Sequence, residues 1–165
     1  MEIAYCTMET TIFGEIFLAA DHQSLVDISL TNEDWEVFIA KHNVSFCPST
    51  PVLLQAKKQL EEYFNKERQT FEIPMRLAGT PFQQKVWGQL RNIPYGTTCS
   101  YGDVAKAIER DKAVRAVGQA NRRNPIPIIV PCHRVIGKNK SLTGYSGTRT
   151  DLKEKLLQLE GAILF

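Results

Sequence analysis

One short segment of the chain combines side chains that could do covalent chemistry. Cys132, His133 and Arg134 follow one another directly after Pro131. A thiol attacks carbon as its thiolate, so a nucleophilic cysteine needs a base or a positive charge close by. The imidazole of His133 is the obvious candidate base. The segment therefore predicts nucleophilic chemistry at Cys132, although a lone cysteine is more often just a small buried hydrophobic residue.

The backbone segment that precedes this cysteine is expected to be stiff. Pro125, Pro127 and Pro131 each fix φ near about −65° and each lack an N–H donor, which denies the segment a regular ladder of hydrogen bonds. In an extended segment adjacent side chains point to opposite faces. We therefore expect Cys132 and His133 to communicate through a water molecule rather than by direct contact.

Glu160 is the candidate partner of the imidazole. Residues 151–160 have apolar residues at helical spacing and precede Gly161, a common helix stop. The helix dipole disfavours an anion in the last turn. Glu160 should therefore have a partner, and His133 is a suitable one, although exposed glutamates at helix ends are also common.

A polar loop spans residues 137–148, between the cysteine and this last helix. It contains Gly144, Tyr145, Ser146 and Gly147. Glycines on either side of an aromatic ring and a hydroxyl suit a lid over a planar ligand, and an ordinary surface loop has the same composition.

Two short helices precede the cysteine segment. Thr80 with Gln83, and Ser100 with Asp103, are each spaced as a capping box, which predicts a helix start after each cap. A further helix is expected over residues 112–120, after a short turn, which gives the outline of a helix-turn-helix. Its small side chains would allow close approach to DNA, or simply tight helix packing.

The N-terminal half has a different pattern. Residues 3–7, 15–20 and 25–30 are expected as a strand meander, residues 52–64 as an amphipathic helix, and residues 71–75 as an edge strand that tolerates Pro74. The fold class expected is α+β, with an N-terminal α+β domain over residues 1–79 and a mostly helical domain over residues 80–165.

The composition indicates where in the cell the protein resides more clearly than it indicates what the protein binds. The 165 residues have a formal net charge of +2, which by itself does not indicate nucleic-acid binding. The four cysteines form no CxxC pair, so we expect free thiols rather than a zinc knuckle or disulfide framework. Without a membrane-spanning apolar run or a signal-peptide pattern, a cytoplasmic location is expected, or a nuclear one in a eukaryote.

The segment Pro131–Ile136 resembles the active-site signature of the O6-alkylguanine-DNA alkyltransferases, the methylated-DNA-protein-cysteine methyltransferases. The resemblance extends in order over residues 80–161. The further matching segments are Thr80–Trp87, Ile93–Gly96, Ser100–Tyr101, Arg115–Gly118, Asn124–Pro125, Tyr145–Gly147 and Leu156–Gly161.

This resemblance implies direct DNA repair by a single-turnover transferase. The alkyl group of O6-alkylguanine, and of O4-alkylthymine, would move irreversibly to Cys132 after the nucleotide is flipped out of the duplex. The implied fold is a ribonuclease H-like N-terminal domain followed by a winged helix-turn-helix domain. The implied partner is double-stranded DNA with little sequence preference. We expect a monomer without a cofactor, and no membrane association.

The resemblance also implies a role for individual residues. Cys132 would accept the alkyl group, His133 would act as its base through water, and Glu160 would orient His133. Tyr101 would help rotate the nucleotide and donate a proton to the leaving guanine, and Arg115 would fill the gap in the base stack. Asn124 would brace the turn, and the backbone at Val135 would accept the guanine amino group. Tyr145 and Ser146 would line the pocket, and Ser100 would belong to the DNA-binding set.

No metal is expected. Some relatives bind zinc in the N-terminal domain, and here Cys6 is present while a second cysteine near the second strand is absent. Two alternative functions remain open. A damage-binding relative would replace the cysteine, which is intact here, and a cysteine hydrolase using Cys132 and His133 would turn over repeatedly and need an oxyanion motif that we do not recognise.

Overall fold

The computed structural model describes residues 2–137 and 150–162. It divides into two compact units, Met1–Ala78 and Gly79–Phe165. The first contains a four-stranded sheet with two helices, and the second is mostly helical, so the predicted α+β class is confirmed. Among the described residues, every helix is too short or too polar to cross a membrane.

The sheet of the first unit is built from β1 (Ile3–Thr10), β2 (Gly14–Ala20), β3 (Leu25–Ser29) and β4 (Val44–Phe46). The strand order is β3-β2-β1-β4, and β1, β2 and β3 form an antiparallel meander. The predicted meander is confirmed. The short β4 pairs with β1 in parallel and was not expected from the sequence.

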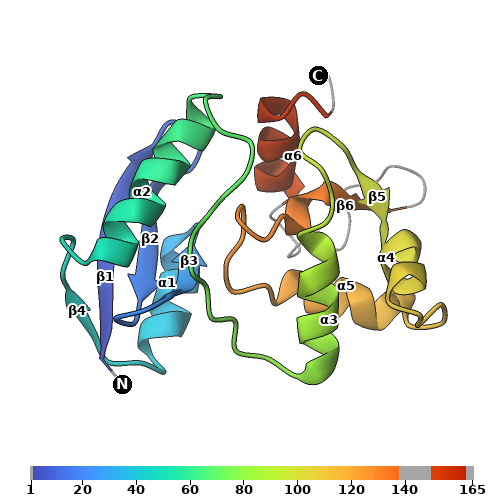
Figure 1. Cartoon of the computed structure of the whole chain (residues 1–165), viewed down its shortest axis with the longest axis horizontal. Coiled ribbons are helices and arrows are strands. Elements are labelled where there is room, and N and C mark those ends of the chain that lie inside the picture. The colour runs from blue at the N-terminus through green and yellow to red at the C-terminus, as the bar shows by residue number, and fades with distance from the viewer. Residues whose placement is uncertain (1, 138–149, 163–165) are drawn as a thin grey trace. The chain divides into compact units, whose positions relative to one another are not determined.

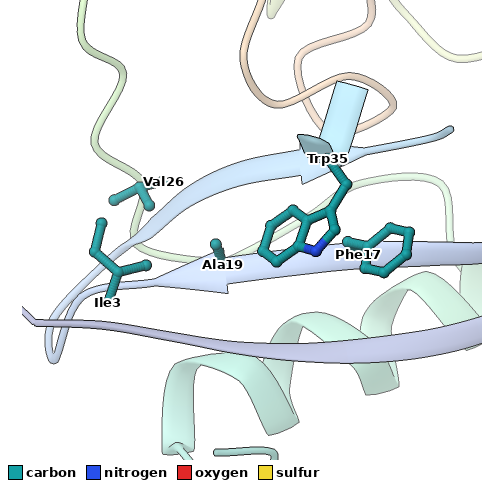
Figure 2. Close-up of a cluster of buried hydrophobic side chains, with 5 residues drawn as sticks. All are labelled: Ile3, Phe17, Ala19, Val26 and Trp35. Atoms are coloured by element: carbon teal, nitrogen blue, oxygen red, sulfur yellow. The ribbon is translucent and has the colours of Figure 1, made fainter. Parts of the chain in front are cut away.

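Two helices pack against this sheet, on opposite faces. Helix α2 (Pro51–Phe64) matches the predicted amphipathic helix, and α1 (Asn32–Ile39) was not expected, although Thr31 caps it by accepting a hydrogen bond from the Asp34 amide. Figure 2 shows the ring of Trp35 from α1 beside Phe17, with α2 in pale green on the other side of the sheet. The two rings are stacked with centroids 5.0 Å apart, which gives this face an aromatic core.

The strand expected over residues 71–75 is wrong. Only an isolated bridge joins Met75 to Leu25, through Leu25 N–H to the Pro74 carbonyl and Arg76 N–H to the Leu25 carbonyl. Pro74 has no N–H to donate, so the ladder does not extend along the segment.

The second unit contains α3 (Pro81–Leu90), α4 (Tyr101–Ala107), α5 (Val114–Arg122) and α6 (Thr150–Leu159), labelled in Figure 1. Both predicted capping boxes are present at the starts of α3 and α4. Helix α5 begins at Val114 rather than near residue 112. The turn before it includes a left-handed residue at position 109, with φ of 59°.

Close contacts lock these helices together. The indole N–H of Trp87 in α3 donates to the carbonyl of Ala120 in α5 at 2.9 Å, deep in the core. A methyl group on Gly79 would come within 2.5 Å of the Trp87 ring, so only glycine fits there without displacement. In Figure 1, β5 (Cys99–Ser100) lies beside β6 (Val135–Ile136), to which it pairs in parallel.

Candidate active site

Cys132 begins a 3-10 turn, η1 (Cys132–Arg134), and its side chain is 2% exposed. The extended segment expected here is wrong. The Cys132 amide donates to the Val130 carbonyl at 2.8 Å, and the Arg134 amide donates to the Pro131 carbonyl at 3.0 Å. In a 3-10 helix successive side chains point about 120° apart, because there are about three residues per turn. Cys132 and His133 therefore do not lie on opposite faces of a strand.

Asn124 fixes the loop that leads to the cysteine. Its side-chain amide donates to the Val130 carbonyl at 2.7 Å, and its carbonyl oxygen accepts from the Ile126 amide at 3.0 Å. Ile128, at the bend, has a positive φ of 75°, which is strained for a β-branched residue. The two hydrogen bonds of Asn124 span the bend.

Asn121 is a second contact to the cysteine backbone, and we did not identify it from the sequence. The residue lies on α5 and is 1% exposed. Its side-chain nitrogen donates to the Cys132 carbonyl at 3.2 Å. Helix α5 thus connects directly to the residue that carries the thiol.

Glu160 accepts hydrogen bonds from the two residues that follow the cysteine, His133 and Arg134. The Nε2 atom of His133 lies 2.7 Å from Oε2, so the contact expected between Glu160 and His133 is present. Arg134 donates to the same carboxylate from Nε at 2.8 Å and from Nη2 at 3.0 Å. The Gly96 amide donates at 3.3 Å. These donors satisfy a carboxylate whose side chain is fully buried.

Arg134 is the partner that sequence reasoning missed. Its third hydrogen bond, from Nη1 to the Ile93 carbonyl, measures 2.7 Å, and its guanidinium lies over the Tyr95 ring at 5.7 Å from the centroid. The sequence signal was present, since Arg134 and the segment Ile93–Gly96 both belong to the matching motifs.

His133 has one ring nitrogen in use and one available. Because Nε2 faces a carboxylate, the neutral ring holds its proton on Nε2, and Nδ1 is left as an acceptor. Nδ1 is buried and has no hydrogen-bond partner among the described residues. Burial lowers the pKa of His133 against the opposing effect of Glu160, and the charges of Arg134 and Lys153 lower it further. The ring is therefore held neutral and can accept a proton at Nδ1.

Tyr101 is the first residue of α4, directly after the cap Ser100. Burial raises the pKa of Tyr101 to about 12, and a negative charge on Cys132 contributes in the same direction. The Nζ atom of Lys153 lies 3.4 Å from its hydroxyl. Gly118 of α5 faces the Tyr101 ring, since a methyl group there would lie 3.9 Å from it. Tyr101 is thus held near the thiol by neighbours on two helices.

The other predicted site residues are more dispersed. Arg115 is exposed on α5, and Val135 is fully buried in β6, next to η1. Tyr145 and Ser146 lie outside the described residues. Within residues 2–137 and 150–162 no group of three or more His, Cys, Asp or Glu side chains is arranged to hold a metal ion.

Comparison with known families identifies both halves of the chain. Residues 81–162 match the family described as 6-O-methylguanine DNA methyltransferase, DNA binding domain. Residues 3–77 match its companion, 6-O-methylguanine DNA methyltransferase, ribonuclease-like domain.

Individual relatives agree along nearly the whole length. The chain is 51% identical over 156 residues to the constitutive methylated-DNA--protein-cysteine methyltransferase of Bacillus subtilis, covering 94% of each chain. It is 44% identical over 158 residues to a methylated-DNA--protein-cysteine methyltransferase of Methanosarcina acetivorans, covering 96% of this chain and 98% of that one.

Solved structures agree as well. The O6-methylguanine methyltransferase of Mycobacterium tuberculosis has a TM-score of 0.85 and 39% identity, covering 99% of this chain and 95% of that chain. A structure of Mycobacterium tuberculosis OGT in complex with DNA has the same TM-score at 38% identity, covering 98% of this chain and 94% of that one. The chain belongs to the 6-O-methylguanine DNA methyltransferase family.

Proposed function

We propose that this protein repairs DNA by moving the alkyl group of O6-alkylguanine, and of O4-alkylthymine, onto Cys132. The observation that supports this most directly is the arrangement around the thiol. A nearly fully buried cysteine follows a braced loop, and next to it lies a neutral histidine whose Nδ1 is available while Nε2 is held by Glu160. This arrangement suits one nucleophilic displacement on a buried substrate.

The proposed reaction is a displacement at the alkyl carbon, coupled to two proton transfers. Cys132 loses its proton through a water molecule to His133 Nδ1, and the thiolate attacks the alkyl carbon. The S–C bond forms from a sulfur lone pair as the C–O6 bond breaks, and that electron pair passes to the purine. The purine takes up one proton from Tyr101, so guanine leaves in its neutral form; the proton held at His133 then returns to Tyr101 through water, and both side chains end the step neutral. Glu160 keeps the imidazole in the tautomer that accepts at Nδ1.

The thioether formed at Cys132 explains why each protein molecule should react only once. The cysteine thiolate is a poor leaving group from a thioether, and hydrolysis would require a strongly activated water to attack the alkyl carbon. The neutral imidazole of His133 is far too weak a base to drive attack of water on a saturated thioether carbon, and Glu160 is bound by Arg134 and His133. Each protein molecule therefore repairs one base, whereas a cysteine hydrolase would release its acyl group and turn over.

The proposed partner is duplex DNA, bound with little dependence on sequence. O6 is out of reach inside the base stack, so the damaged nucleotide must be rotated into the site at a cost of a few kcal/mol. The exposed Arg115 on α5 is proposed to fill the gap left in the stack, and Ser100 and Tyr101 at the start of α4 to steer the nucleotide. The backbone at Val135 is proposed to accept the guanine amino group, with Tyr145 and Ser146 lining the pocket.

The protein would act as a monomer in the compartment that holds the DNA, the cytoplasm, or the nucleus of a eukaryotic cell. Binding through phosphate contacts predicts affinity that falls as salt rises.

The decisive experiment mixes the protein with a duplex containing one O6-methylguanine and measures the intact mass. We expect a gain of one methyl group, located at Cys132 by peptide mapping, and substrate consumption that stops at one equivalent. Cys132→Ser should gain nothing, and Cys47→Ser, which alters an exposed cysteine, should react normally. A methyl group on another residue, or consumption beyond one equivalent, would refute the proposal.

A further inference from the structure

A fully buried lysine lies within electrostatic reach of the thiol, and none of the residue roles described above includes it. Lys153, on α6, has 0% exposure, although lysine is almost never fully buried without a partner. Keeping an ammonium group out of water is costly unless an opposite charge or several acceptors compensate. Such a residue indicates a functional requirement for positive charge at this place.

Within residues 2–137 and 150–162, groups on α4, β5 and η1 interact with the ammonium group. Tyr101 of α4 offers its hydroxyl at 3.4 Å and its ring, whose centroid is 5.5 Å from Nζ. Cys99 of β5 and Cys132 of η1 are near enough for their negative forms to raise the Lys153 pKa, while burial lowers it to about 8. Tyr101 and Cys99 both have raised pKa values, about 12 and about 11, so both stay neutral at pH 7. Of these three groups, Cys132 is thus the one that can supply a negative charge to Lys153.

The charges of the other described groups around Cys132 and Lys153 largely cancel one another. Glu160 is neutralised by the bidentate contact of Arg134. His133 is neutral, because burial lowers its pKa and Lys153 itself adds to that effect. Farther out, Arg122 acts on Tyr101 and Asp103 acts on Cys99, with opposite signs. Among these described groups, Lys153 therefore supplies the net positive charge that acts on the sulfur.

We propose that Lys153 is the counter-charge that holds Cys132 as a thiolate in the resting protein, while His133 remains neutral. This proposal rests on the proposed function, since it concerns the same sulfur. The thiol proton is released to solvent, Lys153 keeps its own proton, and the two groups form a buried pair with no net charge. The thiolate is then present before DNA binds, and His133 serves as the path for the proton rather than as its final holder. Lys153 is a positioning residue in this scheme, because it acts on the substrate through the sulfur.

The first test measures ionisation of Cys132 without any DNA. Thiolate absorbance near 240 nm is recorded against pH, and the curve of the matching Cys132→Ser protein is subtracted, which isolates Cys132 from the other cysteines. Lys153→Met removes the charge and keeps the apolar stem. We expect its thiolate midpoint to rise by about one pH unit or more. Lys155→Met, an exposed position on the same helix, should leave the midpoint unchanged. An unchanged midpoint in folded Lys153→Met would overturn the proposal.

A second test needs no change at Lys153, so a folding defect cannot obscure it. The chain has three histidines, and His22 and His42 are exposed. In the His22→Gln, His42→Gln protein labelled with 15N at histidine, the ring shifts report His133 alone. We expect the neutral tautomer protonated at Nε2 throughout the pH range in which the thiolate is present. An imidazolium that appears and disappears together with the thiolate would make His133 the counter-charge and exclude Lys153.

Methyl transfer separates the role of Lys153 from the repair reaction itself. The same samples are mixed with methylated duplex, and methyl transfer to Cys132 is followed by mass. Lys153→Met is expected to transfer at least tenfold more slowly at pH 7 and to recover as pH rises. Normal transfer by Lys153→Met with an unchanged midpoint removes only the role of Lys153. Absence of transfer in the unmodified protein removes the proposed function itself.

Discussion

Arg134 binds the Glu160 carboxylate with two parallel hydrogen bonds, from Nε at 2.8 Å and from Nη2 at 3.0 Å. A planar guanidinium matches a carboxylate in this way, and lysine cannot reproduce it. The pair joins the turn that carries Cys132 to the end of α6, and the additional bond to the Ile93 carbonyl includes the loop after α3. Three segments distant in sequence are therefore held by a single side chain.

Replacing Arg134 should destabilise the folded protein. Arg134→Met leaves Glu160 buried with an uncompensated charge, so we expect the free energy of unfolding to fall by about 3–5 kcal/mol. Urea denaturation at pH 7 measures it. Arg91→Met, at the exposed end of α3, is the matched control and should change stability by less than about 0.5 kcal/mol. A loss below about 1 kcal/mol for Arg134→Met would show that the buried pair is not needed for stability.

Two glycines in neighbouring segments should respond in opposite directions to alanine. Gly96 has φ of 78°, and a methyl group there would come within 3.2 Å of the Glu160 carbonyl, so Gly96→Ala should destabilise the protein by about 1–2 kcal/mol. Gly88 lies exposed in α3 with open space around it, so Gly88→Ala should stabilise by about 0.5–1 kcal/mol. Thermal unfolding of both variants checks this. Equal shifts of the melting temperature would contradict the assigned backbone constraint at Gly96.

Arg115 provides a test of base flipping that is independent of the thiol. Arg115→Ala should slow methyl removal from duplex DNA roughly tenfold or more, while transfer from free O6-methylguanine base stays near normal, because a free base leaves no gap to fill. Rates are compared by single-turnover kinetics on both substrates. Lys112→Ala, an exposed position just before α5, controls for general loss of positive charge. A similar loss on both substrates would assign Arg115 to the structure of the site.

The first unit contains a carboxyl group that should make stability depend on pH. Burial raises the pKa of Asp27 to about 7, the Ser29 hydroxyl opposes this, and Asp34 adds to it. An unfolded chain has an ordinary pKa near 3.9, so between about pH 4 and pH 7 the folded state binds the extra proton. The contribution of Asp27 is thus fully present below about pH 4 and is lost as pH rises through about 7.

Removing the carboxyl group of Asp27 should make the free energy of unfolding depend less on pH. Asp27→Asn retains an acceptor for Ser29 and cannot ionise, so its stability relative to the unmodified protein should increase by about 1–3 kcal/mol between pH 4.5 and pH 8. Urea unfolding at the two pH values measures the difference. Parallel profiles for the two proteins would mean that Asp27 titrates normally.

Several features followed from sequence alone because local interactions determine them. The capping boxes at Thr80 and Ser100 each involve a side chain and a backbone group three residues apart, so their residue types were enough to place the helix starts. The stiffness before Cys132 came from prolines, which act on their own backbone. The need of Glu160 for a partner followed from its place at a helix end. The motif order over residues 80–161 then pointed to the family.

Other features were decided only by the tertiary structure. Nothing local marks Lys153 as fully buried, or Arg134 as the second partner of Glu160, because both depend on which helix faces η1. The segment 71–75 had the composition of a strand and formed a single bridge, since pairing needs a neighbour with matching donors. Spacing in sequence fixes which groups can meet within one turn or one helix. The burial and the compensation of each charge depend on the tertiary structure, because residues far away along the chain form the environment of that charge.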